Sequence, residues 1–311
     1  MGTIQVSKLH TFQGHRDAVY TLEPLDGRTL FFSGAGDGMV VKWDLTQPDQ
    51  GKLVANVQNS VYALQAIPDK QLLVVGENFE GIHVIDLVAS KELGSLALTK
   101  SAIFDIAHIN GKLIVATGSG KVLLVDLAGL AVERELEFST KSARCIAVNS
   151  QGNEFAVGYS DHSIRVFDLP SLTLKYELLG HTNSVFTVAY HPVLPLLVSA
   201  GRDAHIKTWE QQQQYQERHS IPAHMYAINH IDFSPNGHHF VTCSMDKSIK
   251  VWDALEFKLL KVIDKIRYAG HGTSVNKCEL RLKTHVNVTY RLAAMALTTL
   301  AAVGRRDDED C

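Results

Sequence analysis

Three sets of histidine, hydroxyl and aspartate residues recur in the sequence at one fixed spacing. Each set is followed by a tryptophan, and the offsets of 18, 4 and 6 residues are the same in all three: His15, Ser33, Asp37 and Trp43; His181, Ser199, Asp203 and Trp209; His224, Thr242, Asp246 and Trp252. Histidine, serine and aspartate are the residue types of a hydrolase triad, in which the imidazole accepts the proton of the attacking hydroxyl. A nucleophile is needed once, however, whereas this pattern occurs three times, each time with an indole N–H that can only donate a hydrogen bond. The recurrence favours a structural role, and we expect no catalytic residue and no enzymatic activity.

The residues around each set predict paired β-strands. In the stretch Phe240–Asp253, β-branched residues alternate on either side of the polar turn Ser244–Lys247, which is the pattern of a β-hairpin. Stretches of this kind end in six dipeptides whose second members lie 40 to 43 residues apart: Trp43-Asp44, Ile85-Asp86, Val125-Asp126, Phe167-Asp168, Trp209-Glu210 and Trp252-Asp253. No linker interrupts this period, so the 311 residues are expected to form one large closed β domain rather than two domains.

The repeat and its markers resemble the WD-repeat family of β-propellers. Gly14-His15 and Gly180-His181 open units that close on Trp-Asp or Trp-Glu, and blades of that family hold four strands in about 40 to 45 residues. The resemblance implies an all-β propeller of seven blades, each of four antiparallel strands, in which residues 6–12 close the ring as the outer strand of an atypical last blade. It also implies that the His, Ser/Thr, Asp and Trp side chains form a buried structural hydrogen-bond relay.

Some repeats lack these markers. In the second repeat the four positions hold only apolar residues: Val57, Val75, Phe79 and Ile85. The third is similar, and the fourth keeps Asp161 without the hydroxyl. The simultaneous loss of the His, Ser/Thr, Asp and Trp residues from one repeat is physically reasonable. A buried aspartate without partners would destabilise the fold, whereas replacing the whole set by apolar residues leaves the stability nearly unchanged. We expect Asp161 to bond backbone amides of its own turn.

The end of the chain fits the repeat least well. Counted from Gly270-His271, the same offsets reach three residues, of which only the first matches the pattern: Thr289, Ala293 and Thr299. A degenerate blade, an altered C-terminus, or a helix over the alanine-rich run 292–303 would each fit. We interpret residues 1–304 as one propeller domain with an atypical blade from 270, and residues 305–311 as a flexible charged tail.

Composition and charge narrow the function classes. The net charge of −3 comes without a cluster of basic residues, so nothing predicts binding to nucleic acid or an anionic membrane. The four cysteines form no Cys-x-x-Cys pair, and no glycine-rich phosphate loop opens a helix, so neither a metal nor a cofactor is expected. No apolar leader or run of about 18 apolar residues is present. These features favour a cytoplasmic, monomeric propeller.

A candidate partner-binding rim follows from the start of each first strand. The aligned residues there are Tyr20, Tyr62, Phe104, Arg144, Phe186, Asn229 and Asn276. In similar propellers this position commonly faces a partner, together with the residue before the turn aspartate, here Gly36, Arg202 and Met245. Tyrosine and arginine are enriched at interface hot spots.

Three interpretations of this rim stay open. The favoured one is a non-catalytic scaffold that docks protein or peptide partners on the rim around the central channel. In the second, the aromatic residues pack inward between blades and bind nothing. In the third, the chain is an enzyme or small-molecule-binding propeller with a site at the channel mouth, where Arg144, Arg202 and Asp105 are the ionisable residues expected.

Overall fold

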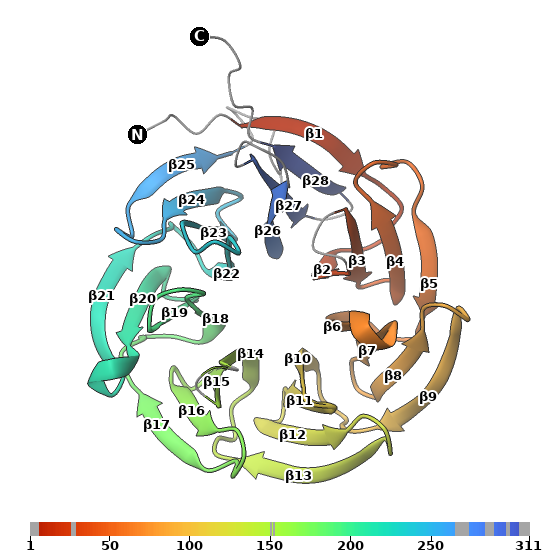
Figure 1. The fold of residues 1–311 in the computed structure, drawn as a ribbon, viewed down its shortest axis with the longest axis horizontal. Coiled ribbons are helices and arrows are strands. Elements are labelled where there is room, and N and C mark those ends of the chain that lie inside the picture. The colour runs from red at the N-terminus through yellow and green to blue at the C-terminus, as the bar shows by residue number, and fades with distance from the viewer. Residues whose placement is uncertain are drawn as a thin grey trace.

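The computed structural model describes residues 6–25, 29–149, 151, 153–264, 274–283, 289–296 and 299–304. For residues 7–9, 281–283, 289–296 and 299–304 it describes the backbone alone. The described strands form seven four-stranded antiparallel sheets, which stand side by side as a ring around an open centre (Figure 1). In each of the six sheets built from consecutive strands, the first strand lies at the centre of the ring and the last at the circumference (Figure 1).

Six of these sheets are blades built from four consecutive strands. Blades 1 and 2 comprise β2 (Val19–Pro24), β3 (Leu30–Ala35), β4 (Met39–Asp44) and β5 (Lys52–Asn56), then β6 (Val61–Ile67), β7 (Leu72–Glu77), β8 (Gly81–Asp86) and β9 (Lys91–Ala97). Blades 3 and 4 comprise β10 (Ile103–Ile109), β11 (Lys112–Thr117), β12 (Lys121–Asp126) and β13 (Ala131–Glu137), then β14 (Ala143–Asn149), β15 (Glu154–Tyr159), β16 (Ile164–Asp168) and β17 (Leu174–Leu178). Blades 5 and 6 comprise β18 (Val185–Tyr190), β19 (Leu196–Gly201), β20 (His205–Glu210) and β21 (Gln216–Pro222), then β22 (Ile228–Phe233), β23 (His239–Ser244), β24 (Ile249–Asp253) and β25 (Leu259–Ile263). Two short 3₁₀ helices, η1 (Pro68–Lys70) and η2 (Gln211–Gln213), lie in connections.

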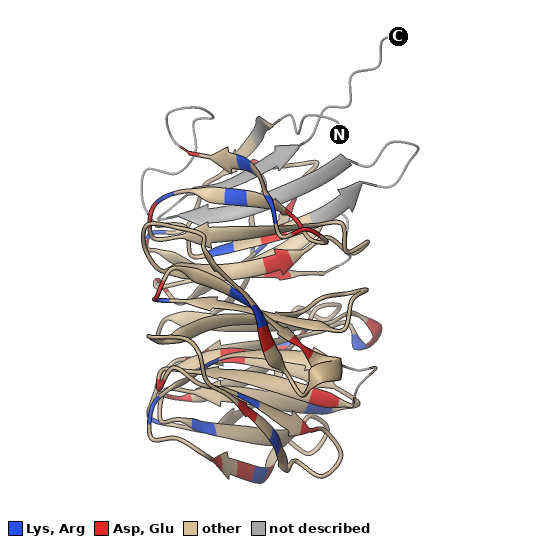
Figure 2. Cartoon of the chain, turned by 90° about the vertical axis from the view of Figure 1, so that its left-hand side faces the viewer, with Lys and Arg blue, Asp and Glu red and all other residues tan. Residues whose placement is uncertain are grey.

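The core lies between blades rather than within them. Second strands such as β15 are buried along their whole length, because both faces of the sheet pack against neighbouring blades. Ile82 and Val84 of blade 2, for example, share one cluster with Leu113 of blade 3. The outer strand β13 is exposed at six of its seven residues, and acidic and basic residues are interspersed over the edge of the disc (Figure 2).

The seventh sheet joins the two ends of the described chain. Its strand order is β1 (Ser7–Phe12), β28 (Thr299–Gly304), β27 (Thr289–Ala296) and β26 (Lys277–Lys283), and β1 pairs antiparallel with β28 from Ser7 opposite Gly304 to Phe12 opposite Leu300. The alternative of a helix over 292–303 is therefore wrong, since pairing with neighbouring strands overrides the weak helical preference of alanine.

The prediction of four-stranded antiparallel blades is confirmed. For six blades the structure describes strands, side chains and packing, whereas for most of the seventh sheet it describes strand order, so a complete seventh blade stays a prediction. The described part of that sheet contacts both neighbours: Cys278 packs in one cluster with Val241 of blade 6, and Phe12 packs with Trp43 of blade 1. Gly270-His271 and residues 305–311 lie outside the described residues.

Candidate functional site

The first strands of the blades line the open centre of the ring (Figure 1). At one mouth of this channel is a cavity of about 140 Å³. All seven aligned rim residues line it: Tyr20, Tyr62, Phe104, Arg144, Phe186, Asn229 and Asn276. The repeat period thus brings together residues that are far apart in the sequence.

A β-bulge presents six of these side chains, all except Asn276. In all six described blades the register between the first and second strands shifts at this residue, for example between Val19 and Thr21 around Tyr20, and between Val61 and Ala63 around Tyr62. A bulged residue leaves the ladder and its side chain is re-aimed. The bulge explains why one position per repeat turns toward the channel mouth, and the sequence pattern gave no separate sign of it.

Five of the residues form a continuous arc, which we call the aromatic arc: Tyr20, Tyr62, Phe104, Arg144 and Phe186. The Tyr20 and Tyr62 rings meet edge to face with centroids 4.4 Å apart, and Tyr62 stacks on Phe104 at 5.9 Å. The Arg144 guanidinium carbon lies 4.2 Å from the Phe104 ring centroid and 5.4 Å from that of Phe186. All five side chains stay partly exposed. They therefore pack on one another around the mouth and are not buried between the blades.

The other predicted rim residues are placed differently. Asn229 donates from Nδ2 to the Val275 carbonyl at 2.8 Å, and thus ties blade 6 to the seventh sheet. Arg202 and Met245 are exposed in the turns after β19 and β23, but neither lines the cavity. Sequence reasoning missed Met225 and Tyr226, which are 84% and 63% exposed beside Met245.

Charged side chains on the first strands link neighbouring blades, and two of them, Asp105 and Lys277, line the mouth cavity. Glu23 accepts a hydrogen bond from the Ala66 amide at 2.8 Å, and Asp105 accepts one from the Ile146 amide at 2.8 Å. Burial raises the pKa of Glu23 to about 8 and raises the pKa of Asp105, in both cases against the opposing charge of Lys277. Burial acts to lower the pKa of Lys277, but the surrounding carboxylates raise it. These groups are engaged in holding blades together, and the sequence analysis had assigned none of them this role.

The three repeated sets form the hydrogen-bond relay that the family resemblance implied. In blade 1 the Trp43 indole donates to Ser33 Oγ at 2.8 Å, Ser33 Oγ lies 2.7 Å from His15 Nε2, and His15 Nδ1 lies 3.2 Å from Asp37. In blades 5 and 6 the histidine–aspartate distances are 2.7 and 2.8 Å. The Ser33, Ser199 and Thr242 side chains are fully buried. A hydroxyl that is buried and already holds two partners has no access to a substrate, so this geometry does not fit a nucleophile.

The family comparison bears on these repeats directly. The family model described as "WD domain, G-beta repeat" matches residues 6–44, 132–168, 172–210 and 215–253. The chain belongs to the WD-repeat β-propeller family. The three complete relays lie within the matched segments, whereas blades 2 and 3, whose repeats lack the relay, lie mostly outside them.

Several curated proteins are similar to this WD-repeat chain. A striatin homolog from Dictyostelium discoideum is 23% identical over 79% of this chain and 35% of its own length. Transducin-like enhancer protein 2 from Mus musculus is 24% identical over 79% of this chain and 32% of its own length. WD repeat-containing protein SL1-17 from Schistosoma mansoni is 25% identical over 80% of this chain and 83% of its own length. The chain thus spans about a third of the length of the first two relatives.

Two WD repeats replace the missing relay with other charged groups. In blade 4, Asp161 accepts from the Ser163 amide at 3.1 Å, as expected, but it also pairs with Arg165 at 2.9 Å. Although burial opposes it, hydrogen bonds from Ser163 and Arg165 help to lower the pKa of Asp161 to about 2. The expected bond to the turn is thus present, and the ion pair with Arg165 is an addition that the sequence analysis did not predict.

In blade 2 the replacement is an acid–histidine–acid chain. Glu77 Oε1 accepts hydrogen bonds from the Gln58 and Asn59 amides, both at 3.0 Å. His83 Nε2 lies 2.8 Å from Glu77, and His83 Nδ1 lies 3.0 Å from Glu92. Glu77 lies two positions before the relay aspartate position, so a search at fixed offsets could not find it.

Within the described residues, no group of three or more His, Cys, Asp and Glu side chains is arranged to hold a metal ion. Cys145, Cys243 and Cys278 are buried free thiols. None of the helices in the described part of the chain is long and apolar enough to cross a membrane.

Proposed function

We propose that this WD-repeat propeller is a non-catalytic interaction module that docks protein or peptide partners on the rim around the channel mouth. The observation that carries the proposal is the aromatic arc, in which four aromatic rings and one guanidinium contact one another in sequence yet stay partly exposed. Side chains that are already held in place lose little conformational entropy when a partner binds.

The surface beside the arc supports the same proposal. Met225, Tyr226 and Met245 are exposed together on blade 6, where the Met245 amide donates to the Ala227 carbonyl at 3.0 Å and joins the two turns. Exposed apolar side chains that gather in one place commonly mark an interaction surface. One relative of this chain, actin-interacting protein 1-2 from Arabidopsis thaliana, is named after a protein partner.

An enzyme or small-molecule-binding propeller has less support. The mouth cavity of about 140 Å³ is smaller than the roughly 300–1,000 Å³ typical of ligand pockets. Asp105, the acidic residue of this cavity, already accepts hydrogen bonds from two backbone amides. We propose further that the protein is monomeric and cytoplasmic. We propose that it uses no cofactor and binds neither nucleic acid nor a membrane. We also propose the sheet of β1 and β26–β28 as the seventh blade.

Tyr62→Ala and Phe104→Ala should each weaken partner binding about tenfold, the loss typical of a hot-spot residue. The assay is capture of partners from a lysate by the purified protein, followed by mass spectrometry and titration of the proteins recovered. Leu174→Ala, which shortens an exposed apolar side chain on the outer strand β17, is the matched control. Equal binding by all three variants and the wild type would exclude the arc as the docking surface.

A further inference from the structure

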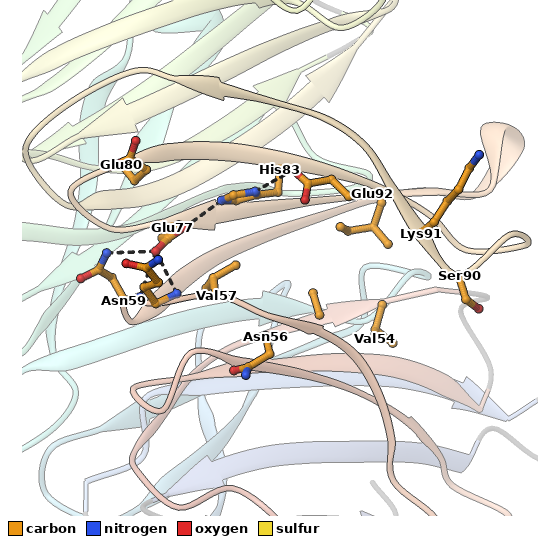
Figure 3. A pocket seen from close by; sticks show the side chains of 13 residues that line it. Val54, Asn56, Val57, Asn59, Glu77, Glu80, His83, Ser90, Lys91 and Glu92 are labelled. Atoms are coloured by element: carbon orange, nitrogen blue, oxygen red, sulfur yellow. Dashed lines mark hydrogen bonds and ion pairs between the residues drawn. The ribbon is translucent and has the colours of Figure 1, made fainter.

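A groove lies between blades 1 and 2 at the outer side of the ring. The corresponding space between the seventh sheet and blade 1 is filled by the tryptophan of blade 1. The Trp43 indole packs against the Phe12 ring of the preceding sheet with centroids 5.5 Å apart. At the same repeat position blade 2 has Ile85, and Val57 replaces the relay histidine. A cavity of about 570 Å³ lies between β5 and strands β8 and β9, with Val57 and Ile85 in its wall (Figure 3).

The floor of this groove is charged and fixed. Glu77 is only 4% exposed, and its hydrogen bonds to the turn at 58–59 hold it in place. Both ring nitrogens of His83 face carboxylate oxygens, so His83 donates to both acids only as an imidazolium. Burial acts to lower the pKa of His83, but hydrogen bonds to Glu92 and Glu77 raise it. His83 is thus held between the carboxylates of Glu77 and Glu92.

The walls of the groove leave negative charge facing solvent. The Glu92 side chain is 47% exposed, and its Oε1 contacts His83 Nδ1 at 3.0 Å. Glu80 pairs with the highly exposed Lys100 at 3.5 Å, a surface contact of small energy. Lys91, the other cation of the lining, lies at the end of the groove away from Glu77 (Figure 3). The lining therefore holds the carboxylates of Glu77, Glu80 and Glu92 and one lysine, Lys91, besides His83.

We propose that this groove is a second binding site, distinct from the channel mouth, which takes a basic side chain of a peptide segment. An arginine guanidinium would bind the partly exposed carboxylate of Glu92, since its planar fork matches a carboxylate. Its aliphatic stem would lie along Val54, Val57 and Ile85, as long basic side chains do on apolar surface. In the described part of the chain, β5 pairs with β4 alone, so its outer edge is open beside the groove to the backbone of such a segment.

The site is tested by titrating the full chain, labelled at isoleucine, leucine and valine methyls, with the peptide acetyl-Gly-Arg-Gly-amide. The expected result is a saturable shift of the Val54, Val57 and Ile85 methyl signals. The neutral peptide acetyl-Gly-Gln-Gly-amide should leave them in place. Equal shifts with both peptides, no shift with either, or a larger response to acetyl-Gly-Glu-Gly-amide would each overturn the proposal.

Two variants locate the contact. Glu92→Gln should weaken binding of the arginine peptide about three- to fivefold, the scale of one partly exposed ion pair. Glu135→Gln, at a 51% exposed glutamate on β13 of blade 3, changes the net charge equally and should leave binding unchanged. Ile85→Trp should fill the groove and abolish the methyl shifts at Val54 and Val57, with the melting temperature measured in parallel to show that the variant folds. Undiminished binding by folded Ile85→Trp would place the peptide elsewhere.

Discussion

Replacing Asp246 by alanine is expected to lower the free energy of unfolding by about 2–4 kcal/mol. Asp246 holds His224 Nδ1 at 2.8 Å and the Ser248 hydroxyl at 2.6 Å. Without the carboxylate, the buried Nδ1–H of His224 loses its acceptor, and the relay that continues to Thr242 at 2.7 Å and Trp252 at 3.0 Å loses its end. A buried donor left unpaired costs its full desolvation, which a surface substitution does not.

Chemical denaturation of purified wild type and variant measures this difference. Asp49→Ala is the matched control, because Asp49 is an exposed aspartate in the connection between β4 and β5. The unfolding free energy of this variant should stay within about 0.5 kcal/mol of that of the wild type. Equal stabilities of the Asp246 and Asp49 variants would show that the relay contributes nothing measurable.

Acid should reduce the difference between wild type and Asp246→Ala. Burial lowers the pKa of His224. Although burial opposes it, hydrogen bonds from His224 and Ser248 lower the pKa of Asp246. Both pKa values thus fall below those of the unfolded chain, about 6.5 and 3.9. The unfolded state therefore binds more protons, but the loss of stability from His224 below about pH 6.5 is common to wild type and variant. The contribution of Asp246, which only the wild type carries, is fully present above about pH 3.9 and is lost as the pH falls below that value. The difference between wild type and variant should therefore persist down to about pH 4 and shrink below it, and a constant difference from about pH 7 to about pH 2 would contradict this assignment.

The ring of blades could be predicted because each repeat carries its own strand and turn markers. The spacing of Trp43, Trp209 and Trp252 from their relay partners indicated the repeat and its period, and the same period aligned Tyr20 and Phe104 at one position of the repeat. These features depend on local pattern and repetition, which a single sequence contains.

The blade 2 network could not be predicted because its groups occupy other positions. Glu77 lies earlier on the second strand than the relay aspartates, and its longer side chain still reaches the amides at 58 and 59. At the aspartate position itself, Phe79 is exposed with a positive φ of 67°. A search at fixed offsets detects a hydrogen-bond network that repeats at the same positions, but it does not detect a different network built from neighbouring positions. The groove beside Ile85 lies in the blade that carries this different network.

The seventh sheet shows the limit of propensity in the same way. The run 292–303 is rich in alanine, and nothing in its local sequence distinguishes a helix from a strand. What decides is the pairing of β27 and β28 with strands at either side, one of which comes from the other end of the chain. Contacts of such sequence separation leave no local pattern.

Removing residues 1–12 is expected to cause aggregation and a loss of more than about 3 kcal/mol of stability, the scale of deleting one buried phenylalanine. Phe12 is 1% exposed, and its ring lies 5.4 Å from Phe31 and 5.5 Å from Trp43 between centroids. A loss of this size is a large fraction of the roughly 5–15 kcal/mol that stabilises a typical domain.

Aggregation follows from what the truncation uncovers. Native outer strands such as β13, with the sequence AVERELE, carry charges that discourage pairing with another chain. With β1 removed, the outermost strand of its sheet is β28, whose sequence TLAAVG has no charge. The Phe12→Ala variant separates the two effects, since it deletes the ring but keeps the strand. It should be destabilised yet monomeric by size-exclusion chromatography, whereas the truncated chain should form large species. Slow amide exchange across 7–12 and 299–304 in the wild type would support the same closure. A truncated chain that stays monomeric with wild-type stability would mean that β1 does not close the ring.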